Sequence, residues 1–209
     1  MNILVIAPHP DDEAIGCGGT LCNHAVRGDR IAVVFLTSGE LGLKKIPRNQ
    51  AWKIRESEAA RSRKILGITA LHFLRLPDWY VSKHIRRAAG FLRPILKQEK
   101  PGMIYLPHSG DWHPDHKAAL PIVRAALRGS GLPVPAVRGY EVWTPITEPH
   151  HIADITKMMP RKLRAVRAHR SQLSEIDYAR AVQGLNQYRG ELSTRFHYAE
   201  VFQNIDLKS

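Results

Sequence analysis

Short apolar runs alternate with amphipathic stretches along the chain. The run from Asn2 to Ala7 (NILVIA) is continuous and of strand length, which is typical of a strand buried on both faces. Further strands are predicted over 30–37, 70–74, 103–106 and 137–143, with a last strand or extended segment over 196–202. Because these runs alternate with helical patterns, the sequence predicts a Rossmann-like α/β fold with a mostly parallel sheet flanked by helices.

The amphipathic stretches between the apolar runs predict helices. Gly28 and Gly67 stand where two of these helices should stop. The predicted helices cover 16–27, 51–66, 85–98, a stretch beginning near 114, 161–169 and 176–188. A chain of 209 residues can build one well-buried core, so residues 1–209 are expected to form a single domain.

Composition is that of an ordinary globular protein, with 44% hydrophobic and 24% charged residues. The first apolar run is too short for a secretory leader, and no stretch reaches the roughly 20 apolar residues that span a bilayer. Cys17 and Cys22 lie in a predicted helix and are interpreted as reduced core thiols. These features favour a cytoplasmic protein without a membrane partner.

The net charge of +12 is the one unusual bulk property, and it suits nucleic acid, an anionic membrane surface or an acidic small substrate. The basic residues are spread along the chain, however, and Lys53 to Lys64 mixes them with Glu as on a solvated helix face. No basic run is interleaved with aromatic residues, so no nucleic-acid partner is expected. If the charge gathers at a pocket, it favours an anionic sugar conjugate or a nucleotide-linked amide.

A nucleotide- or nucleic-acid-binding α/β module is the alternative from another class of function. Gly16, Gly18 and Gly19 follow the first predicted strand, but the G-x-G-x-x-G spacing of dinucleotide sites is absent. The acidic residues just before these glycines would also repel a pyrophosphate. The sequence therefore favours an enzyme of another kind.

Residues suited to chemistry fall directly after the predicted strands. In an open parallel sheet, ligands bind outside the carboxyl ends of the strands, near the point where the strand order reverses. The segments at these ends are 9–13, 38–43, 77–80, 108–116 and 144–145. We therefore expect one site to be built from several of these loops.

The first cluster is Pro8-His9-Pro10-Asp11-Asp12-Glu13. A hydrolytic zinc takes nitrogen and oxygen ligands and keeps one position open for water. His9 and Asp12, three apart on a tight turn, can face one point, which leaves Asp11 free to face the water. Capping of a following helix would explain one aspartate, but not three consecutive acidic residues after His-Pro.

The second cluster is Asp111-Trp112-His113-Pro114-Asp115-His116. Pro114 fits the first turn of a helix, with Asp115 at its positive end. His113 and His116 are three apart and could face one pocket, and the spacing permits either of them as a metal ligand. Together the two clusters supply three ligands and spare acid–base groups, as a catalytic zinc requires.

Three weaker candidates lie outside these clusters. Arg55 and Glu58 form either a surface i,i+3 pair or part of a site. Asp78 follows a predicted strand, where it either closes a turn or contacts substrate. His169 lies in the late helical region and either packs there or lines the pocket.

The two histidine blocks resemble those of the LmbE-like, or PIG-L, zinc deacetylases, which remove acetyl groups from N-acetylglucosamine-type sugars and related amides. The resemblance rests on HPDDE at 9–13 and HPDH at 113–116, and it covers nearly the whole chain. Arg55 with Glu58, Leu76-Pro77-Asp78 and Tyr140-Glu141-Val142-Trp143 support it. One departure is that Trp79-Tyr80 follow Leu-Pro-Asp, where the family often has Gly.

The resemblance implies a Zn²⁺ cofactor held by His9, Asp12 and His116, with Asp11 as general base. It further implies that His113, protonated or hydrogen-bonding, stabilises the oxyanion, and that Asp115 orients a neighbouring imidazole. Arg55 is carried over as a substrate contact, beside Asp78. The implied partner is a small N-acetylated, sugar-like molecule. The motifs do not separate sugar deacetylation from hydrolysis of a thiol-sugar conjugate, and the sequence leaves a homo-oligomer open.

Overall fold

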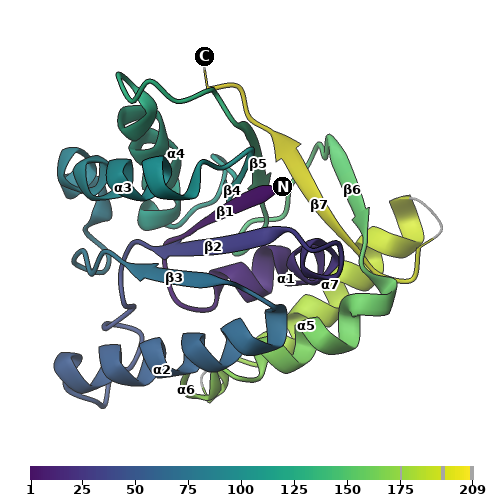
Figure 1. The fold of residues 1–209 in the computed structure, drawn as a ribbon. Coiled ribbons are helices and arrows are strands. Elements are labelled where there is room, and N and C mark those ends of the chain that lie inside the picture. Colours follow the sequence, from purple (N-terminus) through teal and green to yellow (C-terminus); the bar gives the residue numbers. More distant parts are fainter. Residues whose placement is uncertain (175, 194–195, 208–209) are drawn as a thin grey trace.

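A seven-stranded sheet runs through the protein in the order β3-β2-β1-β4-β5-β7-β6 (Figure 1). The computed structural model describes residues 1–174, 176–193 and 196–207. The first five strands of that order are parallel, whereas β7 pairs antiparallel with β5 on one side and with β6 on the other. The strands are β1 (Asn2–Ala7), β2 (Arg30–Phe35), β3 (Ala70–Phe73), β4 (Met103–Pro107), β5 (Ala136–Tyr140), β6 (His151–Asp154) and β7 (Ala199–Asn204).

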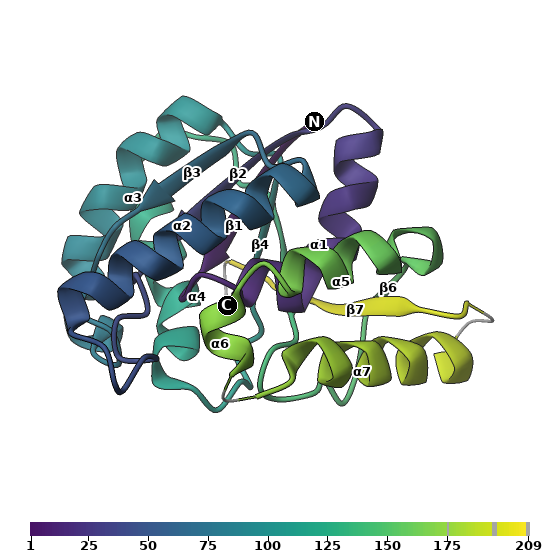
Figure 2. The same cartoon turned by 90° about the horizontal axis from the view of Figure 1, so that it is seen from below.

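Helices cover both faces of the sheet (Figures 1 and 2). On one side lie α3 and α4, and on the other lie α1, α2, α5 and α7. The helices are α1 (Asp12–Val26), α2 (Arg48–Leu66), α3 (Ile85–Glu99), α4 (Pro114–Leu127), α5 (Met159–Val166), α6 (Arg170–Leu173) and α7 (Tyr178–Ser193), with short 3-10 turns at Val81–His84 and Thr156–Met158. None of the helices in the described ranges is long and apolar enough to cross a membrane.

The central strand explains why the apolar run at the N-terminus is continuous. Ile3 and Val5 of β1 join the core under α1, α2, α5 and α7, whereas Leu4 and Ile6 join the core under α3 and α4. Successive side chains of a strand point to opposite faces, so a strand covered on both sides must be apolar at every position. The predicted α/β fold with a mostly parallel, helix-flanked sheet is confirmed.

Helix α1 and strand β5 have boundaries that differ from the sequence prediction. Helix α1 begins at Asp12 rather than at 16, and it kinks at Cys17, whose φ of −140° is not helical. Strand β5 ends at Tyr140, and the residues after it leave the sheet. Strand β6 was not predicted, and the closing segment forms β7, which pairs with it.

The kink in α1 leaves two backbone amides that a buried charge network takes up. Glu200 of β7 accepts hydrogen bonds from the backbone N–H groups of Gly19 and Thr20, each at 2.8 Å. The ammonium of Lys162 is fully buried and lies 2.6 Å from the same carboxylate. The network ties the helix that follows the first histidine block to the edge of the sheet.

We expect Glu200→Ala to lower the free energy of unfolding by about 3–5 kcal/mol, because it leaves a buried ammonium without its carboxylate partner and two backbone amides without their acceptor. Glu191→Ala is the matched control, since the Glu191 side chain is 55% exposed and its ion pair is with exposed His197. It should change stability by less than about 0.5 kcal/mol. Urea denaturation of both variants measures the difference, and equal midpoints would contradict the assignment.

Candidate active site

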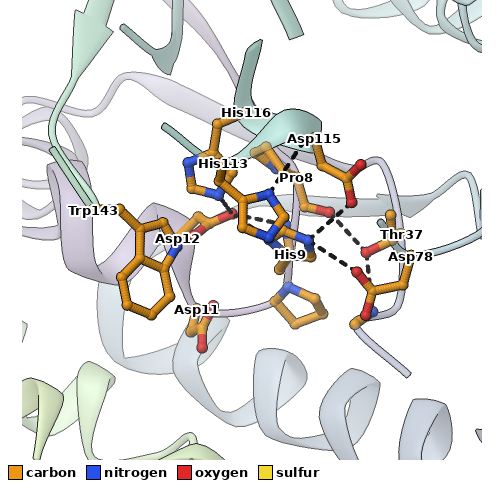
Figure 3. A network of polar contacts seen from close by, with 12 residues as sticks. Pro8, His9, Asp11, Asp12, Thr37, Asp78, His113, Asp115, His116 and Trp143 are labelled. Atoms are coloured by element: carbon orange, nitrogen blue, oxygen red, sulfur yellow. Dashed lines mark hydrogen bonds and ion pairs between the residues drawn. The ribbon is translucent and has the colours of Figure 1, made fainter. Parts of the chain in front are cut away.

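The two histidine blocks meet at the carboxyl ends of the two central parallel strands. His9 to Asp12 follow β1, and His113 to His116 follow β4, its neighbour in the sheet. The chain crosses from one side of β1 to the other between β3 and β4, so this is the switch point at which such sheets bind ligands. The expected assembly of strand-end loops into one site is what the structure shows (Figure 3).

Three buried side chains converge on one point of this site. Asp12 Oδ2 lies 3.3 Å from His9 Nδ1 and 3.3 Å from His116 Nε2. His9 is 7% exposed, Asp12 2% and His116 1%. The turn that brings them together is tight: Asp11 has a φ of 127°, and the backbone N–H of His9 donates to the Asp12 carboxylate at 2.8 Å.

These residues fit a metal ion. Their ligand atoms all lie within 4.8 Å of one another, and two imidazole nitrogens with one carboxylate oxygen make a donor set of the kind catalytic zinc uses. Both ring nitrogens of His116 are buried without a hydrogen bond of proper geometry. A buried ring nitrogen without a hydrogen-bond partner costs free energy unless a ligand binds it. A bound cation would satisfy the Nε2 atom that faces Asp12.

A second group of three, His9, His113 and Asp115, overlaps the first. Its atoms are already engaged, because the two oxygens of Asp115 accept backbone N–H groups from Trp79 at 2.7 Å and Val81 at 3.1 Å. His113 Nδ1 in turn accepts the backbone N–H of Asp115 at 3.2 Å. The first group is therefore the better donor set for a metal.

Carboxylates stand behind both imidazoles of the first group. His9 Nε2 lies 3.3 Å from Asp115 Oδ2 and 3.1 Å from Asp78 Oδ1, and His116 Nδ1 lies 3.4 Å from Asp111 Oδ2 (Figure 3). Such carboxylates orient a metal-binding imidazole and fix which of its nitrogens carries the proton. Asp111 also accepts the backbone N–H groups of His113 and Trp143. Asp111 belongs to the second cluster but was not predicted as a site residue, although its place two residues before His113 was a usable signal.

This excess of carboxylates sets the protonation of the cluster. Burial opposes a charge on His9, but hydrogen bonds to carboxylates, first that of Asp115, outweigh it and hold the pKa of His9 well above its usual value. Burial likewise opposes a charge on His116, yet the charge of Asp12 raises the pKa of His116 to about 9. Burial opposes the ionisation of Asp12 as well. The charge of His116 and hydrogen bonds to both histidines outweigh it and hold the pKa of Asp12 well below its usual value. Metal binding would displace protons from His9 and His116, because metal ligands bind in their deprotonated forms.

Asp11 lines the same pocket as this cluster and pairs with Arg55. Asp11 lies to one side of the dashed network in Figure 3, and Arg55 Nη2 donates to its Oδ2 at 3.1 Å. Burial raises the pKa of Asp11 to about 6, against the opposing charge of Arg55. The other bonds of Arg55 go to backbone carbonyls of Pro10 and Gly39. Arg55 thus holds the Asp11 loop in place.

The surface-pair interpretation of Arg55 and Glu58 is wrong. The two residues are 4% and 2% exposed, and Glu58 accepts hydrogen bonds from the backbone N–H and the hydroxyl of Ser171. His169 is also buried, with Nε2 3.7 Å from a Glu13 oxygen. Glu58 and His169 are therefore both buried, and His169 lies next to Glu13 of the first histidine block.

His113 is neutral in this environment. Burial, together with the charges of the neighbouring His9 and His116, lowers the pKa of His113 to about 4. Because His113 Nδ1 accepts a backbone N–H, the neutral ring carries its proton on Nε2. A neutral His113 is a hydrogen-bond donor, which favours the hydrogen-bonding form over the protonated form that the sequence also left open.

A pocket of about 360 Å³ opens over the cluster. Asp78 lies in its wall but is only 3% exposed, and its second oxygen accepts the backbone N–H of Leu41. The lining residues are His9, Asp11, Asp12, Ile15, Leu41, Gly42, Lys44, Arg55, Asp78, Trp79, Trp112, His113, Val142, Trp143, Gln172, Ile176 and Tyr178. The aromatic residues of this wall were not predicted as site residues.

The fold and the site together define this protein as an α/β protein with a candidate His–Asp metal site at the switch point of its sheet. Comparison with known proteins then gives the family. Residues 4–127 match the PIG-L family, described as GlcNAc-PI de-N-acetylase, and the chain belongs to this family of deacetylases. The resemblance inferred from the two histidine blocks is confirmed.

Characterised relatives cover most of the chain. It is 31% identical over 196 residues to a diacetylchitobiose deacetylase of Thermococcus kodakarensis, covering 83% of this chain and 71% of that one. It is 28% identical over 190 residues to a probable N-acetyl-alpha-D-glucosaminyl L-malate deacetylase 2 of Bacillus anthracis, covering 83% and 82%. The structure of N,N'-diacetylchitobiose deacetylase from Pyrococcus horikoshii superposes with a TM-score of 0.85 at 25% identity, covering 99% of this chain and 84% of that one.

Proposed function

We propose that this protein is a zinc-dependent hydrolase that removes the acetyl group from an N-acetylglucosamine-type sugar conjugate. The observation that carries the proposal is the convergence of His9, Asp12 and His116 beneath an open pocket, with Asp11 beside them. The names of the relatives support the substrate class, since they describe deacetylases of N-acetylated sugars.

His9, Asp12 and His116 would hold the zinc ion. When bound, zinc supplies a Lewis acid that polarises an amide carbonyl and lowers the pKa of water from about 15.7 to near 7. The carboxylates of Asp115 and Asp111 keep the two imidazoles oriented toward that point. The remaining steps belong to side chains of the pocket.

Asp11 is the proposed general base. With a pKa raised to about 6 it is ionised at neutral pH and still basic enough to accept a proton from the attacking water. Arg55 fixes the carboxylate through Oδ2, so the carboxylate keeps one orientation during the reaction. The proton that Asp11 accepts can then pass to the departing amine.

His113 is the proposed oxyanion donor. Its Nε2–H is available because Nδ1 is bonded to the backbone, and the ring lines the pocket. A donor aimed at the developing negative charge of the tetrahedral intermediate stabilises the transition state more than the substrate. Asp78 and Arg55 remain predicted substrate contacts, made through the parts of their side chains that border the pocket.

We expect His113→Ala to lower kcat by roughly 10²–10³, the usual cost of one oxyanion donor. Its zinc content, measured by elemental analysis, should stay at the wild-type level because His113 is outside the proposed ligand set. A variant that loses its zinc would instead place His113 among the ligands.

A screen of N-acetylglucosaminyl compounds tests the proposed function. Acetate release is measured for each compound, with chelator-treated protein and with the same protein after zinc is restored. We expect release from at least one sugar conjugate, lost with the chelator and regained with zinc. Release only from amides of thiol-sugar conjugates would move the protein to the amidase alternative, and no release from either class would end the proposal.

A further inference from the structure

Trp79 has a backbone conformation that its side chain does not favour. Its φ is 69°, in the left-handed region that glycine adopts without steric cost and in which a bulky residue is strained. Its backbone N–H donates to Asp115, a bond that glycine could make equally well. The indole is 46% exposed, so burial in the core does not explain it either. The reason for a tryptophan at this position therefore lies in what its indole ring contacts.

Trp79 is one end of a row of aromatic rings along the pocket. Its ring centroid lies 6.3 Å from that of Trp112, which lies 5.8 Å from Trp143, which lies 5.8 Å from Tyr178. All four residues line the pocket, and Trp79 also packs on the proposed oxyanion donor His113 at 4.6 Å. We call these four residues the aromatic row.

The rings of the aromatic row lie open beside the reacting centre. Trp112 is 52% exposed and Trp143 is 37% exposed. They come from the loops after β4 and β5, and Trp79 comes from the loop after β3. Trp79 packs on His113, and Figure 3 shows the Trp143 indole near Asp12, so the row borders the candidate metal site along the pocket. It therefore faces the part of a substrate that lies beyond the acetylated sugar.

The pocket is not basic, although the chain has a net charge of +12. Its lining holds two cationic side chains, Lys44 and Arg55, and Arg55 is bonded to Asp11. Three carboxylates, those of Asp11, Asp12 and Asp78, stand against them. Most of the lysine and arginine side chains of the chain therefore lie outside this pocket lining.

We propose that the aromatic row is a subsite for a second, uncharged sugar ring linked to the N-acetylated one. The inference rests on the proposed function and assigns its substrate class as a neutral N-acetylated disaccharide. A pyranose ring offers a flat C–H face that packs on an indole, while its hydroxyl groups stay in water. Half-exposed rings at a pocket mouth suit such a ligand.

Binding measured by calorimetry tests the subsite without relying on turnover. Zinc-loaded Asp11→Asn protein is titrated with N-acetylglucosamine, with N,N'-diacetylchitobiose and with N-acetylglucosaminyl malate. We expect the disaccharide to bind about tenfold more tightly than the monosaccharide, and the malate conjugate to gain no such advantage. Trp79→Gly and Trp112→Ala, each added to this protein, should reduce the tenfold preference to near unity.

The glycine substitution also separates a binding role from a structural one. Because glycine relieves the positive φ, Trp79→Gly should keep or raise the unfolding midpoint. Lys100→Gly is the matched control, since Lys100 has a φ of 45° at the far end of the sheet and should likewise keep its midpoint, with the disaccharide preference intact. A lower midpoint for Trp79→Gly with an unchanged preference would show that the ring is structural.

Three results would overturn the subsite: equal affinity for one and two rings, tighter binding of the malate conjugate, or a preference that survives both tryptophan substitutions. The outcome is independent of catalysis. If the disaccharide preference depends on Trp79 and Trp112 but wild-type protein releases no acetate, the subsite stands and the proposed function fails.

Discussion

Asp11→Asn should retain its zinc and lose roughly 10²–10⁴ of turnover on an N-acetylated sugar. Asparagine has nearly the shape of aspartate, and its carbonyl oxygen can still accept the hydrogen bond that Arg55 donates at 3.1 Å. The loop should therefore keep its conformation. The amide cannot take a proton from water, however, so the loss falls on the chemical step and on kcat rather than on KM.

The neighbouring Asp12→Asn variant is the matched control for this prediction. It makes the same chemical change one residue further on, at a carboxylate whose Oδ2 faces both His9 and His116. It should lose zinc together with activity, whereas Asp11→Asn should lose activity alone. Full activity of Asp11→Asn would show that the base is another group.

His116→Ala should yield protein with little zinc and no measurable deacetylation. Removing His116 takes one of three ligands, and the remaining His9 and Asp12 make an incomplete donor set for catalytic zinc. Asp111→Asn is the graded comparison, because Asp111 stands behind His116 at 3.4 Å without facing the metal point. Loss of such an outer carboxylate costs roughly 10–100-fold in metal affinity, so its zinc should be weakened but detectable.

Zinc titrations of the two variants and of wild type provide the measurement. A His116→Ala protein with one tightly bound zinc per chain would favour the overlapping group of His9, His113 and Asp115. Circular dichroism on the same samples checks that the fold is kept, since His116 is 1% exposed and its truncation leaves a small cavity beside the sheet.

The sequence predicted the parallel core well because burial on two faces leaves a strong pattern. Continuous apolar runs such as Ile3 to Ala7 arise only where both faces of a strand are covered. Strand β6 was missed because its four residues are half-buried or exposed and lack an apolar run. Its place depends on pairing with β7, which lies about 50 residues further along the chain.

The candidate site was predictable only where its residues are neighbours in sequence. His9 and Asp12 belong to one turn, and the rule that ligands bind at strand ends placed both histidine blocks at the same edge. The contact of Arg55 with Asp11 joins residues 44 positions apart, and no local pattern encodes it. The aromatic row has the same origin, because three separate loops each contribute one tryptophan.

The most direct test of the central claim is a zinc titration of metal-free protein followed by acetate release from an N-acetylated sugar conjugate that the screen identifies. If His9, Asp12 and His116 hold a catalytic zinc, the rate should rise in proportion to added zinc and level off at one ion per chain. Acetate release at full rate by metal-free wild-type protein would contradict this claim. So would a His116→Ala variant that reaches the same maximum rate as wild type.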